Sequence, residues 1–277
     1  MLVALILVVV AIGSVAFHLV SPWWWTPIAS NWGYVDDTLI ITFWITGAVF
    51  VAVLLFTAYC VWRFRHREGQ QALYEPENKK LEWWLTVATA VGVVAMLAPG
   101  LYVWNQFVTV PADATEVEVV ARQWSWSYRL PGKDGRLGTS DVRNISTDNP
   151  LGLNANDANG QDDVVIESDN LHLQIGKPVK ILLRSIDVLH NFYVPEFRGK
   201  MDMIPGAVTY YWLTPTRTGS FDILCFELCG IGHSQMRGEV VVAEDAAYQA
   251  WLEKQKTFAE LSGGPRTMKA NYQPEPK

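Results

Sequence analysis

Residues 225–236 read CFELCGIGHSQM and place four side chains that bind soft metal ions within twelve positions. These four are Cys225, Cys229, His233 and Met236. Because the two cysteines and the histidine are spaced four positions apart, they can converge on one centre only if the backbone curls around it as a loop. Thiolate, imidazole and thioether ligands suit copper better than calcium, magnesium or manganese. Two thiolates can bridge two copper ions, and the second imidazole which that arrangement needs is available at His190, in the segment DVLHNFYVP.

Three other interpretations of these residues are open on the sequence alone. Cys225 and Cys229 can form a disulfide if this part of the chain lies in an oxidising compartment. The same cysteines can join His190 and His233 in a structural zinc site, but zinc leaves Met236 and the glutamate between the cysteines without a role. The residues can also be ordinary core. Ligand chemistry favours copper among these possibilities.

The loop resembles the C-x-E-x-C-x-x-x-H-x-x-M signature of subunit II of the haem-copper cytochrome c oxidases, which holds the dinuclear copper centre CuA. Two further segments carry the same resemblance. DVLHNFYVP is similar to the D-V-x-H segment of that family, and GKMDMIPG, at residues 199–206, resembles its K-x-D-x-x-P-G segment. The resemblance extends over roughly residues 35–255.

The resemblance implies a complete ligand set and its place in the fold. The implied ligands are Cys225, Cys229, His190, His233, Met236 and the backbone carbonyl of Glu227. In this pattern the cysteines bridge two copper ions, each histidine terminates one of them, and the methionine and the carbonyl are weak axial ligands. The side chain of Glu227 is expected to face a magnesium or manganese ion at the boundary with subunit I. The loop is expected to join the last two strands, with His190 on a neighbouring loop.

Residues 122–128, RQWSWSY, are similar to the Q-W-x-W-x-Y aromatic segment of the same family. Taken alone, aromatic residues in a strand usually pack in the core or on a sheet face. The resemblance implies that the electron from cytochrome c enters at Trp124, and that Trp126 and Tyr128 lie along the wall toward copper. Ser125 replaces the tyrosine that is usual at its position, so the contact with the electron donor is expected to differ in detail.

The N-terminal part of the chain has the composition of a membrane anchor. Half of all residues are hydrophobic and 18% are charged, and the hydrophobicity is concentrated before residue 110. Apolar segments at about 1–20, 38–62 and 83–107 contain no Asp, Glu, Lys or Arg, and each reaches the length of about 20 residues that spans a bilayer. The first lacks the basic start of a secretory signal, so we interpret it as a retained helix. Members of the family typically have two such helices, and residues 1–110 are predicted to form three.

The charge of the loops predicts the orientation of this anchor. Residues 63–82 include five basic residues, whereas residues 21–37 include none. Because basic loops stay in the cytoplasm, everything after about residue 108 is predicted to lie on the periplasmic side of a bacterial inner (cytoplasmic) membrane.

One carboxylate lies at the cytoplasmic edge of the third apolar segment, in ENKKLEWWLT. Glu82 suits the first turn of a helix, where negative charge is favourable. Its spacing from Asn78 and Thr86 also resembles the family pattern N-x-x-L-E-x-x-W-T, in which the glutamate lies at the mouth of a proton pathway of subunit I. Leu85 stands where the family usually has tryptophan. The sequence thus offers Glu82 as a candidate for proton uptake.

After residue 110 the sequence changes to short runs with strand character, separated by Gly, Pro, Asp and Asn. Many short strands at this spacing predict a Greek-key β-sandwich or barrel, which the resemblance narrows to a cupredoxin-like domain over residues 111–260. A Gly/Asp/Asn-rich insert at 131–163 is predicted to be a long hairpin or surface loop. Residues 244–258 are predicted to form a helix, and residues 261–277 a polar tail.

The predicted function is that of subunit II of a cytochrome c oxidase, which is part of an oxidoreductase and is not catalytic alone. It would accept electrons from cytochrome c at CuA and pass them to haem in subunit I, where oxygen is reduced and protons are pumped. Membrane lipid and the other oxidase subunits are its expected surroundings. The net charge of −6, of which −5 falls after residue 110, argues against nucleic acid and is compatible with a basic protein partner. The alternatives are the copper-bearing small subunit of a nitric oxide reductase and a copper delivery or assembly protein.

Overall fold

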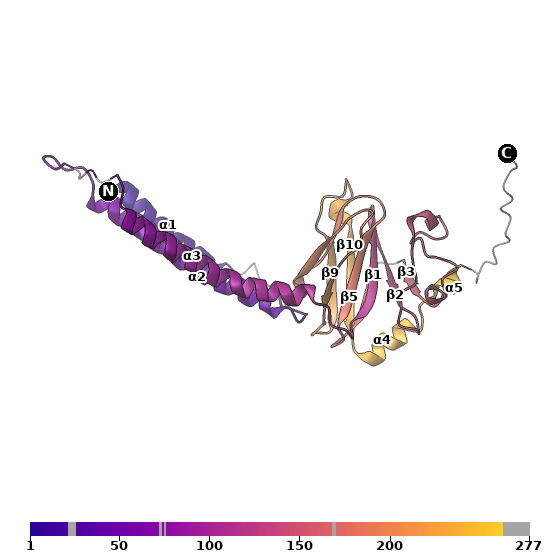
Figure 1. The fold of residues 1–277 in the computed structure, drawn as a ribbon. Helices are drawn as coiled ribbons and strands as arrows, with labels where there is room; N and C mark the ends of the chain where they lie inside the picture. Colours follow the sequence, from indigo (N-terminus) through magenta and orange to yellow (C-terminus); the bar gives the residue numbers. More distant parts are fainter. Residues whose placement is uncertain (22–25, 72–73, 75, 168–169, 263–277) are drawn as a thin grey trace. The chain divides into compact units, whose positions relative to one another are not determined.

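The computed structural model describes residues 1–21, 26–71, 74, 76–167 and 170–262. These residues form two compact units (Figure 1). The N-terminal unit comprises Met1–Thr26 and Gly33–Gln106, and the C-terminal unit comprises Pro27–Trp32 and Phe107–Lys277. From residue 263 onward, the predicted polar tail lies outside the described residues.

The N-terminal unit is built from long apolar helices. They are α1 (Leu2–Val20), α2 (Gly33–Arg63) and α3 (Lys79–Val108). Each is long and apolar enough to cross a membrane, which confirms the prediction of three such helices. With 31 and 30 residues, α2 and α3 are longer than the about 20 residues that a bilayer core requires. Both helices begin before the predicted apolar segments, at Gly33 and Lys79 rather than at about 38 and 83.

Helices α1 and α2 pack against each other through small residues. Ala4 and Ala11 of α1 and Ala58 of α2 are buried. The rings of His18 and Phe43 lie 5.8 Å apart near the other end of α1. Small side chains let membrane helices approach closely and gain van der Waals contact, so α1 is held by the helix that follows it.

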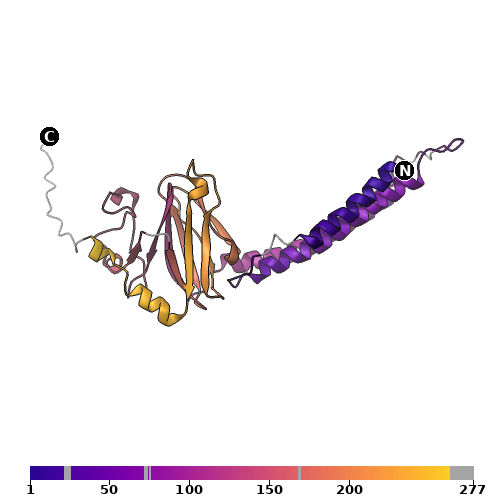
Figure 2. The ribbon, with the colours of Figure 1, turned by 180° about the vertical axis from the view of Figure 1, so that it is seen from behind.

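The C-terminal unit is a β-sandwich of two five-stranded sheets. The first sheet has the order β3-β2-β1-β5-β8 and contains β1 (Thr115–Arg122), β2 (Ser125–Leu130), β3 (Val164–Ile166), β5 (Val179–Ser185) and β8 (Thr209–Leu213). The second has the order β4-β10-β9-β6-β7 and contains β4 (Asn170–Gln174), β6 (His190–Val194), β7 (Gly199–Met203), β9 (Gly219–Cys225) and β10 (Arg237–Ala243). Figure 2 shows the two sheets from behind.

Alternation of side chains explains why these segments form the sandwich. Every second residue of β5 is buried, so Ile181 and Leu183 face the core while their neighbours face outward. Strands β1 and β5 run parallel, with Val117 opposite Ile181, and Phe192 of the second sheet is fully buried. Together with the three long apolar helices, this two-sheet arrangement confirms the predicted membrane-anchored, cupredoxin-like β-sandwich.

The short segment Pro27–Trp32 belongs to the sandwich unit although it lies between α1 and α2 in the chain. The indole N–H of Trp32 donates to the carbonyl of Trp212 at 2.8 Å, and their rings lie 4.9 Å apart. Trp32 is 1% exposed. Burying an aromatic side chain of this size contributes several kcal/mol, so this connection is an integral part of the folded unit.

The insert at 131–163 is more ordered than a plain surface loop. Arg129 contacts Glu118 at 2.9 Å and Asp163 at 2.7 Å, and all three side chains are nearly inaccessible. Leu151 and Leu153 of the insert are buried in a small apolar cluster that also contains Val120 and Phe258. The insert thus covers part of the first sheet. The helix expected at 244–258 is shorter than predicted, because α4 (Asp245–Leu252) ends early and α5 (Phe258–Leu261) follows it.

Candidate metal centre

The loop from Phe226 to Met236 joins β9 and β10, the last two strands, as the sequence analysis expected. Its base is closed by the N–H of Cys225, which donates to the carbonyl of Met236 at 3.3 Å. The N–H of Phe226 donates to the carbonyl of Asn191 on β6 at 3.2 Å. Gly230 has φ +119°, a conformation that side chains other than glycine rarely adopt. These features curl the loop over the end of β6.

The two cysteines of the loop face each other as free thiols. Their Sγ atoms lie 3.6 Å apart, whereas a disulfide requires about 2.05 Å. Cys225 is 8% and Cys229 is 3% exposed. The sulfurs are therefore buried side by side without a bond between them, at a spacing that leaves room for a bridged metal.

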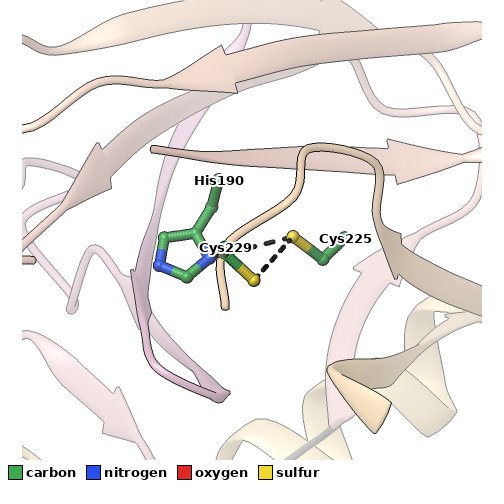
Figure 3. Close-up of side chains that lie close together, drawn as sticks. All are labelled: His190, Cys225 and Cys229. Carbon is green, nitrogen blue, oxygen red and sulfur yellow. Dashed lines mark hydrogen bonds between the residues drawn. The ribbon is translucent and has the colours of Figure 1, made fainter. Parts of the chain in front are cut away.

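His190 completes the group from a different strand (Figure 3). It is the first residue of β6, rather than part of a neighbouring loop as expected, and its position is fixed by pairing with Met203 of β7. Its Nδ1 atom lies 3.8 Å from Sγ of Cys225, and its side chain is completely buried. The ligand atoms of His190, Cys225 and Cys229 all lie within 4.8 Å of one another.

The remaining predicted ligands divide between the two sulfurs. The backbone oxygen of Glu227 lies 3.2 Å from Sγ of Cys225, on the side that His190 also occupies. Nδ1 of His233 lies 3.6 Å from Sγ of Cys229, and Sδ of Met236 lies 3.9 Å from the same sulfur. Each thiol thus has an imidazole and a weaker donor beside it, and His233 also hydrogen-bonds Cys225. Two thiols, two imidazoles and two weaker donors suit a pair of soft metal ions better than one zinc ion, which takes four ligands in a tetrahedron.

The two thiols differ in acidity. Burial raises the pKa of Cys225, but hydrogen bonding to His190, to the backbone of Asn191 and Glu227, and to His233 outweighs burial and lowers this pKa overall. Burial, together with the neighbouring Cys225, raises the pKa of Cys229. Cys225 is therefore the more acidic thiol of the pair. Because thiolate is the form that binds metal, binding of a metal to a protonated thiol would release its proton.

Asp187 orients His190, a role that the sequence analysis did not assign. Its Oδ1 atom lies 2.9 Å from Nε2 of His190. The carboxylate accepts the backbone N–H groups of Gln123 and Val188, each at 2.6 Å. Burial opposes ionisation, but these hydrogen bonds and His190 lower the pKa of Asp187 overall. A carboxylate on the far nitrogen fixes the tautomer that presents Nδ1 to a metal. The sequence did contain a signal for this role, because Asp187 is the aspartate of the D-V-x-H segment.

The three aromatic residues singled out in the sequence lie at different depths. Trp124 is 40% exposed, Trp126 is 1% exposed and Tyr128 is fully buried. The ring of Trp126 lies 6.5 Å from that of His190. Trp124 lies directly on the loop, since a Cβ atom added to Gly232 would come within 2.4 Å of its Cδ2. Trp124 is thus the member of this group that touches both solvent and the loop.

Glu82 lies in the N-terminal unit, near the start of α3. Its Oε1 accepts the N–H of Asn78 at 3.3 Å, while Oδ1 of Asn78 accepts the N–H of Leu81 at 3.1 Å. This reciprocal arrangement satisfies backbone donors that a helix leaves open at its N-terminus. Glu82 therefore has a capping role in the structure.

Comparison with known proteins gives consistent matches. The family model for the periplasmic domain of cytochrome c oxidase subunit II matches residues 115–244. An alternative cytochrome c oxidase subunit 2 from Bradyrhizobium diazoefficiens is 72% identical over 272 residues, covering 98% of this chain and 98% of the relative. A cytochrome c oxidase subunit 2 from Cereibacter sphaeroides is 30% identical over 238 residues, covering 83% of this chain and 77% of the relative. A crystal structure of the periplasmic domain of subunit II of cytochrome oxidase from Bradyrhizobium japonicum is 26% identical, with a TM-score of 0.39, and covers 52% of this chain and 95% of the solved chain.

The extent of these matches decides the family. The relative from Bradyrhizobium diazoefficiens is matched over almost the whole chain, membrane helices and β-sandwich alike. Proteins of this kind are subunits of an oxidoreductase complex. The resemblance seen in the motifs is therefore confirmed: this chain belongs to the cytochrome c oxidase subunit II family.

Proposed function

We propose that this chain accepts electrons from cytochrome c at a dinuclear copper centre and passes them to haem in subunit I, where oxygen is reduced to water and protons are pumped. The observation that carries the proposal is the convergence of two imidazoles, one thioether and one backbone carbonyl on a pair of buried thiols. Copper held by these residues would supply a centre that takes up and releases one electron at a time.

The chain's own residues supply a rigid and dry site. His190 is held by the pairing of β6 with β7 and by Asp187, and Cys225 lies at the end of β9. Ligands built on strands and supported by neighbouring hydrogen bonds keep their geometry more precisely than ligands on free loops. The burial of His190 and Cys229 excludes water, which supports fast electron transfer because little has to rearrange.

We place the docking surface for the electron donor on the outside of the loop. Leu228 is 77% and Ile231 is 97% exposed, and Trp124, in the turn between β1 and β2, packs against the same loop. Contiguous exposed apolar residues mark interaction sites, and an apolar contact of this kind suits the exposed haem edge of a cytochrome. Acidic residues around it would steer a basic donor. In this proposal Trp126 and Tyr128 form the wall of the route toward copper.

Further roles are proposed for two glutamates. The side chain of Glu227 would face a magnesium or manganese ion at the boundary with subunit I, while its carbonyl faces Cys225. Glu82 would pass protons to subunit I in addition to capping α3. The membrane is proposed to be the bacterial inner membrane, with lipid and other oxidase subunits around α1, α2 and α3.

The alternative functions are not favoured. The relatives are oxidase subunits, which argues against the small subunit of a nitric oxide reductase. Copper delivery needs an open site that exchanges its metal, whereas His190 is fully buried and Cys229 is 3% exposed.

Stopped-flow spectroscopy of the assembled oxidase tests the proposal. Reduced cytochrome c is mixed with the oxidised complex without oxygen, and copper and haem are followed separately. Copper is expected to be reduced before haem, and Trp124→Leu is expected to slow that first step alone. Haem reduction that does not depend on copper reduction would contradict the proposal. Consumption of nitric oxide in place of oxygen would favour the reductase.

A further inference from the structure

Gln123 hydrogen-bonds one proposed ligand, Cys229, and also Asp187, the carboxylate that orients a second proposed ligand, His190. It lies in the tight turn between β1 and β2. Its side-chain Nε2 donates to the carbonyl of Cys229 at 2.7 Å. Its backbone N–H donates to Oδ2 of Asp187 at 2.6 Å. The two partners lie 106 and 64 positions away in the chain, so one residue joins three distant segments.

These two hydrogen bonds reach opposite sides of the centre. Asp187 holds His190, whose Nδ1 lies beside Cys225. Cys229 belongs to the other side, with His233 and Met236. Gln123 therefore contacts Cys229 directly and is connected to Cys225 through Asp187 and His190. A change in its position would alter the distance between the His190 side and the Cys229 side.

The same turn also seats the aromatic residue on the loop. Trp124 follows Gln123 directly, and a Cβ added to Gly230 would come within 3.0 Å of Nε2 of Gln123 and within 3.2 Å of the ring of Trp124. The amide and the indole thus lie side by side on the backbone of one glycine. A side chain at Gly230 would displace one or both of them.

We infer that Gln123 is a positioning residue, which sets the spacing of the two sides of the metal centre and holds Trp124 against the loop. The inference rests on the proposed function, because it concerns how that centre is arranged. The chemistry of the side chain is specific. A primary amide donates to a carbonyl, whereas a carboxylate at the same place repels it and an alkyl group leaves it without a donor. The loop needs such a tie because its outward residues, such as Ile231, make few contacts, and segments of that kind open easily.

Hydrogen exchange of the full chain in detergent, without metal, tests this directly. Gln123→Leu removes the amide at similar size, and Gln123→Asn keeps the amide but shortens its reach. Gln174→Leu is the matched control, since it removes a glutamine amide that donates to Asp245 at 2.9 Å, away from the loop. Loss of one neutral hydrogen bond is expected to speed exchange in residues 226–236 by about threefold to tenfold. Gln123→Asn is expected to recover part of the protection, and Gln174→Leu to leave this loop unchanged.

A second measurement uses the copper-loaded full chain. Gln123→Leu is expected to keep the same copper content as the unaltered chain and to change the hyperfine pattern of its EPR spectrum, which a merely structural surface residue would not do. Unchanged exchange in the loop together with an unchanged spectrum would overturn the inference. If the unaltered chain itself lacked a dinuclear centre, the proposed function would fail. The exchange comparison would still decide whether Gln123 holds the loop.

Discussion

The Nε2 atom of His190 lies 2.9 Å from Oδ1 of Asp187, and Nδ1 of the same ring faces Cys225. One imidazole is thus oriented by a carboxylate on one nitrogen and presented to a sulfur by the other. Asp187 is itself held by backbone N–H groups. The geometry of the proposed centre therefore depends on a residue outside the proposed ligand set.

Asp187→Asn is expected to weaken copper binding. The amide keeps the shape of the side chain but loses the charge that fixes the tautomer of His190, and loss of such a supporting carboxylate typically costs about 10- to 100-fold in metal affinity. Competition with a copper chelator measures the effect. Asp222→Asn, at an exposed carboxylate on β9, is the control and should bind copper like the unaltered chain. Equal copper affinity in both variants would show that Asp187 does not support copper binding.

Gly232→Ala is expected to slow the arrival of electrons without removing copper. The added Cβ would lie 2.4 Å from Cδ2 of Trp124, so the indole has to move off the loop. Displacement of a reacting group by about 1 Å can cost on the order of 100-fold in rate. Stopped-flow reduction by cytochrome c gives the rate, and metal analysis gives the copper content. An unchanged rate with a displaced indole would show that electrons do not pass through Trp124.

Glu82→Gln separates the proposed proton role from the capping role. Glutamine keeps an oxygen that can accept the N–H of Asn78, as Oε1 of Glu82 does at 3.3 Å, but it cannot carry a proton at neutral pH. If Glu82 takes part in proton uptake, oxygen consumption by the assembled oxidase should fall while α3 stays intact. Asn78→Ala removes the other half of the cap and is the matched control. Normal oxygen consumption by the Glu82→Gln variant would show that Glu82 only caps α3 and takes no part in proton uptake.

The buried carboxyl of Asp163 is expected to make stability depend on pH. Burial raises its pKa from 3.8 to about 6, and the hydrogen bond from Gly138 and the contact with Arg129 offset burial only in part. The folded state therefore binds this proton more tightly than the unfolded chain. The resulting stabilisation is complete below about pH 4 and is lost as pH rises through about 6. A difference of about two pKa units corresponds to about 3 kcal/mol.

Thermal unfolding of the full chain at pH 4 to 7 checks this expectation. Asp163→Asn cannot ionise and should show a weaker decrease in stability with rising pH than the unaltered chain. Asp148→Asn, at an exposed position of the same insert, should keep the original pH dependence. Parallel curves for Asp163→Asn and the unaltered chain would show that Asp163 does not cause the effect.

The convergence of the loop residues was predictable because it is mostly local. Cys225, Cys229, His233 and Met236 lie within twelve residues, and their spacing alone indicates a loop. The three membrane helices were predictable for a similar reason, since each is a continuous apolar run. Features of this kind can be recognised in the sequence because they depend on residues that are close together in the chain.

Relationships between distant segments were not predictable. Trp32 pairs with Trp212, 180 positions away, and no property of Pro27–Trp32 alone indicates that it belongs to the sandwich. Gln123 was visible only as part of an aromatic motif, because its partner Cys229 lies 106 positions away. The insert appeared as a polar loop, since its few apolar residues, such as Leu153, become buried only when Phe258 packs beside them.

The most direct test of the central claim is the copper content and EPR spectrum of the full chain in detergent, with Cys229→Ser measured beside it. The account predicts two copper ions per chain that share one unpaired electron, with hyperfine structure from both nuclei. Cys229→Ser should lose this pattern, because one bridging sulfur is removed. A single copper ion in the unaltered chain, or zinc bound in preference to copper, would contradict the account.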